Sequence, residues 1–310
     1  MYLRNLRLCA FRNYLDQAVK FEAQKTILLG NNAQGKTNLL EAVELLATLK
    51  SHRTNRDQDL ILEGHPTAQI IATVERAYGS AELSMNLRTA GRRTLSLNQE
   101  PVRRHLDFLG QVNAVQFSSL DLDLVRGSPE SRRNWLDAIL IQLEPIYAQI
   151  LHQYQQVLRQ RNALLKAMRQ QQEGADTTQL SLWDAQLAAA GSRVTRRRAR
   201  VLERLVPIAQ DWHSSISGKA ENLEIRYLPN VSWREDEPAL VQEAFLQKLA
   251  QRRLAEQQLA TTVVGPHRDE VEFTINQTPA KSYGSQGRSE EHTSELQSHS
   301  DLVCRLLLEK

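Results

Sequence analysis

The sequence predicts an α/β fold in which a strand-rich head is split by an inserted helical hairpin arm. Three observations carry this prediction. Short β-rich runs fill most of residues 1–127, one amphipathic helix interrupts them after residue 35, and long helical patterns occupy residues 128–215. Strand patterns resume in residues 216–287, so we expect this part to return to an incomplete head. The last segment, residues 288–310, is polar and differs in character from the rest.

Length and composition exclude several classes of protein. A chain of 310 residues with 41% apolar composition can bury a full core. The N-terminus, MYLRNLRLCAF, alternates apolar and charged residues, and no later run is apolar for long enough to cross a bilayer. We therefore expect a cytoplasmic protein without a membrane partner. The cysteines Cys9 and Cys304 lie far apart, which supports neither a disulfide framework nor a zinc site.

The charge is mildly positive but unevenly distributed. The formal net charge is +3, and basic stretches recur around Arg159 and Arg161, in residues 193–200, and up to Arg253. Basic clusters on helices can follow a phosphate backbone, but they can equally be solvated helix faces. The sequence leaves both interpretations open.

The head is predicted from alternating runs and one helix. In the helix, residues 36–49, the apolar side chains recur at steps of three and four and form one stripe, namely Leu39, Ala42, Val43, Leu46 and Leu49. Strands are predicted at residues 3–8, 26–29, 68–74, 81–87 and 93–98. The order around residue 30 is therefore strand, tight turn, helix.

The arm is predicted as two helices packed side by side. Ser128 and Pro129 are typical of a helix N-cap and first helical position. A turn is expected near Gly174. The first seam consists of Tyr147, Leu151, Tyr154, Leu158, Leu165 and Met168, with Arg161 as a polar interruption, and the return helix carries Leu180, Trp183, Leu187, Val194, Val201, Leu205 and Ile208. Beyond residue 216, strands are predicted at 222–228, 261–266 and 270–275, with a helix at 243–259.

The run GNNAQGKT, residues 30–37, matches the phosphate-binding loop pattern of Gly, four residues, Gly, Lys and Thr. Glycines allow backbone amides to converge on phosphates, a lysine ammonium neutralises the β- and γ-phosphates, and a hydroxyl ligates Mg²⁺. The predicted binding residues for ATP and Mg²⁺ are Gly30, Asn31, Asn32, Ala33, Gln34, Gly35, Lys36 and Thr37, with Thr37 as the metal ligand. No guanine-reading Asn-Lys-x-Asp motif occurs, which disfavours a GTPase, and we find no acceptor site or lid for a kinase.

Four further segments extend this motif into a family resemblance. They are MYLRNLRLCAFRNY at the start, KSHRTNRDQDLI from Lys50, LVRGSPESRRNWLD from Leu124 and TTVVGPHRDEVEF from Thr261. Together with GNNAQGKTNLLEAV they resemble the RecF family of bacterial recombination and replication-repair proteins. The resemblance covers most of the chain. It implies a P-loop ATPase head of the ABC/SMC type that carries an inserted helical hairpin arm.

The same resemblance implies a function in DNA damage repair, replication, recombination and the SOS response. It implies an ATP-dependent homodimer that binds DNA at junctions of single and double strand and works with RecR and RecO to load RecA. Asn32 would reach the γ-phosphate, and Arg12 and Asn13 are weaker candidates that could equally be surface residues. Ser285, Gln286 and Gly287 match the signature that would close over a nucleotide held by the partner subunit.

Other charged residues admit two interpretations. His267, Arg268 and Asp269 could contact nucleotide or a dimer partner, or they could form a structural turn. Phosphate contacts and ion pairs are both open for a further set of arginines, namely Arg53, Arg56, Arg132 and Arg133.

The end of the chain departs from the resemblance after Gly287. Residues 288–298, RSEEHTSELQS, resemble the translation of an adapter oligonucleotide used in short-read sequencing, so we expect residues 288–310 to be non-native. The alternative is a natural polar linker and short helix. If residues 288–310 are non-native, the apolar run before Glu309 only imitates a Walker B strand, and the chain lacks the carboxylates that hydrolysis needs. Two hypotheses follow: a truncated DNA-repair ATPase, or a nucleotide-gated DNA-binding scaffold that needs no hydrolysis.

Overall fold

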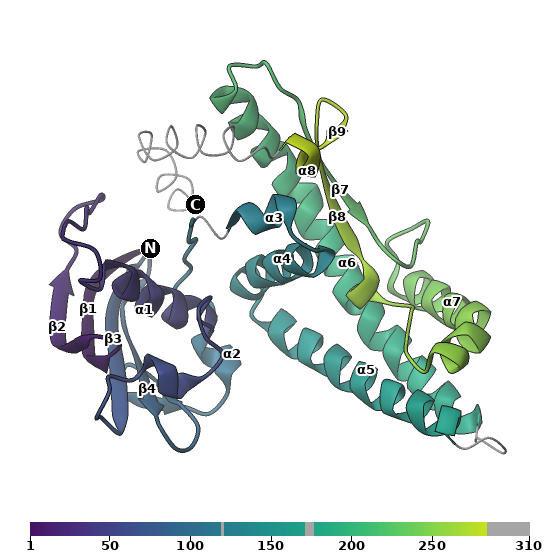
Figure 1. The fold of residues 1–310 in the computed structure, drawn as a ribbon, viewed down its shortest axis with the longest axis horizontal. Coiled ribbons are helices and arrows are strands. Elements are labelled where there is room, and N and C mark those ends of the chain that lie inside the picture. The colour runs from purple at the N-terminus through teal and green to yellow at the C-terminus, as the bar shows by residue number, and fades with distance from the viewer. Residues whose placement is uncertain (119–120, 171–176, 284–310) are drawn as a thin grey trace. The chain divides into compact units, whose positions relative to one another are not determined.

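The computed structural model describes residues 1–118, 121–170 and 177–283, and these residues form two compact units. The first unit contains residues 1–117 and 141–145. The second contains residues 118–140 and continues from residue 146 to the end of the described chain (Figure 1). Sheet and helix are therefore combined in both units.

The first unit is built on a six-stranded sheet whose neighbouring strands are all antiparallel. The strand order is β2-β1-β3-β4-β5-β6. The strands are β1 (Tyr2–Phe11), β2 (Tyr14–Lys20), β3 (Thr67–Arg76), β4 (Gly79–Arg88), β5 (Thr94–Leu97) and β6 (Glu100–Val102). The short helices η1 (Asp57–Leu60) and α2 (His105–Phe108) belong to the same unit.

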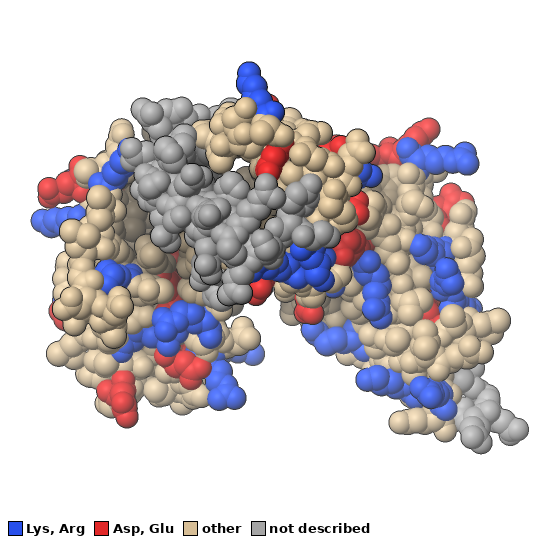
Figure 2. Space-filling view, turned by 45° about the horizontal axis from the view of Figure 1, so that its top comes forward, with Lys and Arg blue, Asp and Glu red and all other residues tan. Residues whose placement is uncertain are grey.

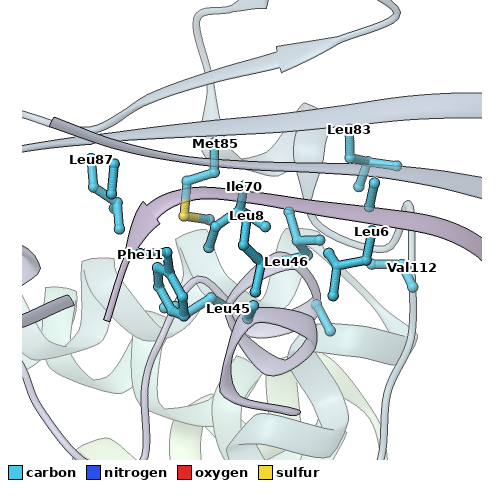
Figure 3. Close-up of a cluster of buried hydrophobic side chains, with 14 of the residues drawn as sticks. Leu6, Leu8, Phe11, Leu45, Leu46, Ile70, Leu83, Met85, Leu87 and Val112 are labelled. Atoms are coloured by element: carbon cyan, nitrogen blue, oxygen red, sulfur yellow. The ribbon is translucent and has the colours of Figure 1, made fainter. Parts of the chain in front are cut away.

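The core of this unit lies between one face of the sheet and helix α1 (Lys36–Thr48), as Figure 3 shows. Residues alternate between buried and half-buried along β3 and β4, which brings Ile70 opposite Met85 and Ala72 opposite Leu83. Leu45 and Leu46 of α1 are fully buried against them. Each large apolar side chain buried in this way stabilises the fold by about 1.5–3 kcal/mol. The predicted helix and its apolar stripe are confirmed, and the stripe is what holds α1 on the sheet.

The strand expected at residues 26–29 is wrong. Thr26–Leu29 forms no strand and pairs with no other segment among the described residues. Two of its apolar side chains are largely exposed, with 81% of Ile27 and 89% of Leu29 accessible, whereas Leu28 is half-buried against the core. A β-rich run becomes a strand only when a neighbouring strand accepts its backbone hydrogen bonds. The edge strands of the large sheet are β2 and β6, and residues 26–29 pair with neither.

The second unit is mainly helical and carries a small antiparallel sheet of order β7-β8-β9. The strands are β7 (Leu223–Leu228), β8 (Glu270–Ile275) and β9 (Thr278–Pro279). Its helices are α3 (Leu122–Arg126), α4 (Pro129–Leu143, of which residues 141–143 group with the first unit), α5 (Ile146–Gln170), α6 (Thr177–Ile216), α7 (Pro238–Leu259), η3 (Pro266–Arg268) and α8 (Ala280–Tyr283).

The predicted helical hairpin is confirmed as α5 and α6, which pack along each other with α7 against both. The seam differs in detail from the prediction. Ile150 and Val157 are buried, whereas Leu151, Leu158 and Met168 are only half-buried. Packing of α7 on the same helix pair shifts the buried stripe of α5 toward Ile150 and Val157. The expected turn near Gly174 lies outside the described residues.

The strand predicted at residues 261–266 is also wrong, although β7 and β8 form as predicted. The backbone amide of Thr262 donates to the side chain of Asn162, and that of Val263 donates to Glu256. The amide of Gly265 donates to Asn230. Side chains from α5, α7 and the loop after β7 therefore take the donors that a neighbouring strand would have used.

The boundaries between the two compact units differ from the boundaries of the predicted segments. The first division falls after residue 117 rather than after 127. The segment expected to return to the head, residues 216–287, packs as far as residue 283 on α6 through β7 and α7. The reason is that β8 finds its partner in β7 and not in the large sheet. None of the helices in the described part of the chain has the length and apolarity to span a bilayer.

Candidate functional site

The loop of residues 30–35 leads directly into α1 and has a backbone that most side chains disfavour. Gly30, Ala33 and Gly35 have φ angles of 152°, 65° and 96°. Gly35 is the N-cap of α1, and no side chain caps the helix there. The first amides of α1 therefore keep donors that no intrahelical acceptor uses, and donors of this kind bind anions.

Lys36 folds back over the loop. Its Nζ donates to the carbonyl oxygens of Gly30 at 2.6 Å and Asn31 at 2.8 Å. Thr37 is exposed, as are the loop residues Asn31, Asn32, Ala33 and Gln34. An ammonium and a hydroxyl thus stand beside the uncapped helix N-terminus, and a bound polyphosphate would meet both.

Two residues at the junction of β1 and β2 contact this loop and the start of α1, namely Asn13 in the turn and Tyr14 at the start of β2. The hydroxyl of Tyr14 donates to the carbonyl of Gly35 at 3.0 Å. The side-chain amide of Asn38 donates to Oδ1 of Asn13 at 2.8 Å. A Cβ added to Gly35 would lie 2.6 Å from the same Oδ1, so only glycine leaves room for Asn13. Asn13 therefore contacts the loop.

Arg12 is anchored inside the protein. Its guanidinium donates to both carboxylate oxygens of Glu41 on α1, at 2.9 and 2.6 Å, and to the carbonyl of Asp59. Ser51 donates to the same carboxylate at 2.5 Å. Burial alone would raise the pKa of Glu41, but the hydrogen bonds from Arg12 and Ser51 outweigh it and hold this pKa below its ordinary value.

Two residues of this network, Glu41 and Tyr14, were not predicted from the sequence. Glu41 lies outside the apolar stripe of α1, and the loop after the helix covers it. No periodicity signals such a carboxylate. A buried acidic residue on the P-loop helix could have been suspected only from the arginine in FRNY, which needs a partner.

The other candidate arginines differ from one another. Arg53 donates to Oδ1 of Asn38 at 2.6 Å and to Glu41 at 3.3 Å, which places it beside the N-terminal turn of α1. Arg56 is exposed, farther along the same loop. Arg132 binds both carboxylate oxygens of Glu270, and Arg133 donates to the carbonyl of Asp269. Arg53 is thus the one of these four with a contact to the P-loop helix among the described residues.

Two residues of the predicted group 267–269, His267 and Asp269, lie in a structural turn, and Arg268 between them is exposed. Nε2 of His267 lies 3.0 Å from the carbonyl of Thr262, which can only accept, so Nδ1 accepts from the hydroxyl of Tyr154 at 2.5 Å. Burial lowers the pKa of His267 to about 4, so the ring is neutral at pH 7. Asp269 accepts from the amide of Asn230 and the hydroxyl of Tyr227. Both side chains are occupied in joining helices and strands.

A buried ion cluster completes this turn. Arg198 donates to both carboxylate oxygens of Asp137 at 2.9 Å, to the carbonyl of Pro266 and to Asp269. A second buried arginine, Arg161, binds Asp184 and Glu256. Each of these buried arginines bonds to groups from more than one segment, so its role is structural.

Part of the predicted basic surface is therefore internal. In residues 193–200, Arg198 is buried, and Arg196 and Arg200 both bind Asp236. Arg253 binds Asp184. These cations are paired with carboxylates, although Arg196 and Arg200 share the single charge of Asp236, and the pairing makes them weaker candidates for phosphate contacts. The predicted signature residues Ser285, Gln286 and Gly287, and the tail 288–310 with Glu309, lie outside the described residues.

Comparison with known proteins shows which family the chain resembles along most of its length. Residues 5–262 match the model of a family described as AAA domain. The chain is 70% identical over 300 residues to the DNA replication and repair protein RecF of Gloeothece citriformis, covering 93% of this chain and 78% of that protein. It is 71% identical over 296 residues to the protein of the same name from Rippkaea orientalis, with the same coverage.

The chain belongs to the RecF family. Two solved structures support the fold. One is the recombination mediator protein RecF with ATPrS in the RecFOR pathway, with a TM-score of 0.86, 29% identity, and coverage of 93% of this chain and 77% of that one. The other, RecF with ATP, has a TM-score of 0.85 and 30% identity, covering 92% of this chain and 76% of that one. The predicted fold class, an ATPase head with a helical arm, is confirmed for this chain of the RecF family.

Proposed function

We propose that this RecF-family chain binds ATP with Mg²⁺ at residues 30–37 and takes part in recombinational DNA repair and replication. The observation that carries the proposal is the Lys36 ammonium beside an uncapped helix N-terminus in a loop with three left-handed or glycine-favoured positions. Two similar chains are RecF structures named with ATP and with ATPrS. This supports ATP as the nucleotide.

The residues at the loop suit the groups of a nucleotide triphosphate. Lys36 would exchange its two carbonyl acceptors for phosphate oxygens, and the amides at the start of α1 would donate to the same phosphates. Asn32 would reach the terminal phosphate. The hydroxyl of Thr37 would hold Mg²⁺, which neutralises charge on the β- and γ-phosphates when bound. Asn13 and Tyr14 would keep the loop in place.

We propose that hydrolysis is slow or absent in this chain. An ABC-type head needs carboxylates to hold Mg²⁺ and to orient the attacking water. Glu41, the carboxylate found beside the loop, is already bound by Arg12 and Ser51. The expected outcome is weak nucleotide binding without steady turnover.

The partners follow from the family. We propose that the intact protein forms an ATP-dependent homodimer, binds DNA at junctions of single and double strand, and acts with RecR- and RecO-type proteins in loading RecA. The names of its relatives, which place RecF in DNA replication, repair and the RecFOR pathway, support this. Ser285, Gln286 and Gly287 would then contact the nucleotide of the partner subunit.

The alternative is a nucleotide-gated DNA-binding scaffold that needs no hydrolysis. Lys36→Arg separates it from an ATPase, because arginine keeps the charge but changes the geometry at the phosphates. The variant should be made in a full-length relative, with ATP binding, ATP turnover and DNA binding measured side by side. Loss of DNA binding together with turnover supports the ATPase. Retained ATP binding and DNA binding without turnover supports the scaffold.

A further inference from the structure

Helix α5 (Ile146–Gln170) contains no aspartate and no glutamate in its 25 residues. It does contain four cations, namely Arg159, Arg161, Lys166 and Arg169. Only Arg161 is buried, and it is bound by Asp184 and Glu256. The other three side chains are exposed. Three positive charges thus remain on the surface of one helix that supplies no negative charge of its own.

Two of the exposed cations, Arg159 and Lys166, lie on the side of α5 opposite its packing seam. The seam repeats at steps of three and four through Tyr147, Ile150, Tyr154, Val157, Arg161 and Leu165. His152, Arg159 and Lys166 follow each other at seven-residue intervals, which keeps them on one face with about 10 Å between successive residues. Arg169 is exposed beside the seam, four residues after Leu165, and not on this stripe. Figure 2 shows that Lys and Arg side chains are spread over the surface of the described residues.

The polar residues between these cations are neutral donors. Gln155, Gln156 and Gln160 are exposed on α5. Within the described part of the chain, no hydrogen bond or ion pair joins Arg159, Lys166 or Arg169 to a carboxylate. This distinguishes the α5 face from the denser cluster on α6, where Arg196 and Arg200 bind Asp236 and Arg198 is buried.

We propose that this outward face of α5 binds the phosphate backbone of a double-stranded nucleic acid without reading its sequence. The inference rests on the proposed DNA-binding function and names the surface that serves it. Arg159 and Arg169 are ten residues apart, or about 15 Å along the helix. A duplex presents roughly nine phosphates over that length, since it carries one charge per 1.7 Å.

A duplex suits this face better than a single strand. Proteins that hold single strands stack the bases on aromatic side chains. The aromatic residues of α5, Tyr147 and Tyr154, are both buried in the seam. Arginine, lysine and glutamine are the side chains that reach phosphate oxygens, and such contacts carry no base information. The face therefore offers backbone contacts only.

The test is a triple variant that removes three positive charges, R159Q/K166Q/R169Q, in the full chain. Glutamine has a helix propensity close to those of arginine and lysine, so α5 is retained. The matched control is R193Q/R204Q/R252Q, which removes the same charge from exposed positions on α6 and α7 of the same unit. Far-UV circular dichroism confirms that both variants are folded.

Binding of a short fluorescent duplex is measured by anisotropy over a series of KCl concentrations. The α5 variant should lose about tenfold or more in affinity, and its slope of log K against log salt should fall by about 0.9 for each lost phosphate contact. The control should stay within about threefold of the parent chain. Equal losses in both variants, or no loss in the α5 variant, overturn the inference and leave the proposed function standing.

Two further measurements separate this inference from a failure of the proposed function and from binding of an acidic protein. If the parent chain binds no duplex at all, the DNA-binding part of the proposed function fails, and the inference fails with it. Polyglutamate of matched charge serves as a competitor. Displacement of the duplex by polyglutamate as effectively as by unlabelled duplex would show a dock for acidic protein instead, and would overturn the inference.

Discussion

The ammonium of Lys36 lies 2.6 Å from the carbonyl oxygen of Gly30, at the opposite end of the same loop. In the absence of a phosphate, the ammonium of Lys36 therefore donates its hydrogen bonds to backbone carbonyls of the loop. Lys36→Met should weaken ATP binding by about 10- to 100-fold, because hydrogen bonds to a charged group contribute about 1.5–3 kcal/mol. Binding of a fluorescent ATP analogue measures this. Lys50→Met, an exposed lysine just after α1, is the control, and an unchanged affinity in Lys36→Met would refute the P-loop assignment.

Gly35→Ala should destabilise the first unit and abolish nucleotide binding. Its φ of 96° is unfavourable for alanine by about 1–2 kcal/mol, and the new Cβ would meet Asn13. Gly64→Ala isolates the backbone contribution, since Gly64 has a φ of 82° with open space around it. Calorimetric unfolding should show a larger loss for Gly35→Ala than for Gly64→Ala, and Asn13→Ala should restore part of the difference. Equal losses at the two glycines would show that the contact with Asn13 is unimportant.

His267 should make the second unit sensitive to mild acid. Its pKa is about 4 in the folded chain and about 6.5 when unfolded, so the unfolded chain binds more protons between these values. The stabilisation is complete above about pH 6.5 and is lost as the pH falls toward 4, amounting to roughly 3 kcal/mol.

Tryptophan fluorescence is suited to this measurement because all four tryptophans, Trp135, Trp183, Trp212 and Trp233, lie in the second unit. The urea midpoint should fall between pH 7 and pH 5 in the parent chain and fall less in His267→Gln. Proton NMR should show the ring titrating near pH 4. A midpoint near 6.5 would contradict the buried, neutral histidine.

Arg198→Met should destabilise the second unit by about 3–5 kcal/mol, because Asp137 and Asp269 would remain buried without their cation. The fluorescence-detected urea midpoint reports the loss. Arg204→Met, an exposed arginine on the same helix, should be nearly neutral. Adding Asp137→Asn to Arg198→Met should recover part of the stability. If the two arginines behave alike, the buried cluster contributes nothing to folding.

The features predicted correctly from the sequence are those fixed by local pattern. The apolar stripe of α1 and the period of α5 and α6 depend on residues within a few turns of each other, so periodicity alone reveals them. The P-loop motif is recognised from its own eight residues, and the nucleotide contacts assigned to them stay a prediction. Arg161 was visible only as an interruption of a seam, because its carboxylate partners lie 23 and 95 positions away in sequence.

The two predicted strands that do not form depend on residues far away in the sequence, which a local pattern does not reveal. Residues 26–29 and 261–266 have the composition of strands, but a strand depends on what lies beside it. Side chains of Asn162, Glu256 and Asn230 take the amides of the second segment. The first has no neighbouring strand in the described part of the chain. The tail from residue 288 stays a prediction, and sequencing the genomic locus beyond the codon for Gly287 tests it.

The bare stretch before the P-loop has a practical consequence. Ile27 and Leu29 are largely exposed, in a segment that forms no strand among the described residues. Segments of that kind attract chaperones in cells and join neighbouring molecules into aggregates at high protein concentration. Preparations of this chain will need dilute handling, and light scattering should be checked before any weak nucleotide signal is interpreted.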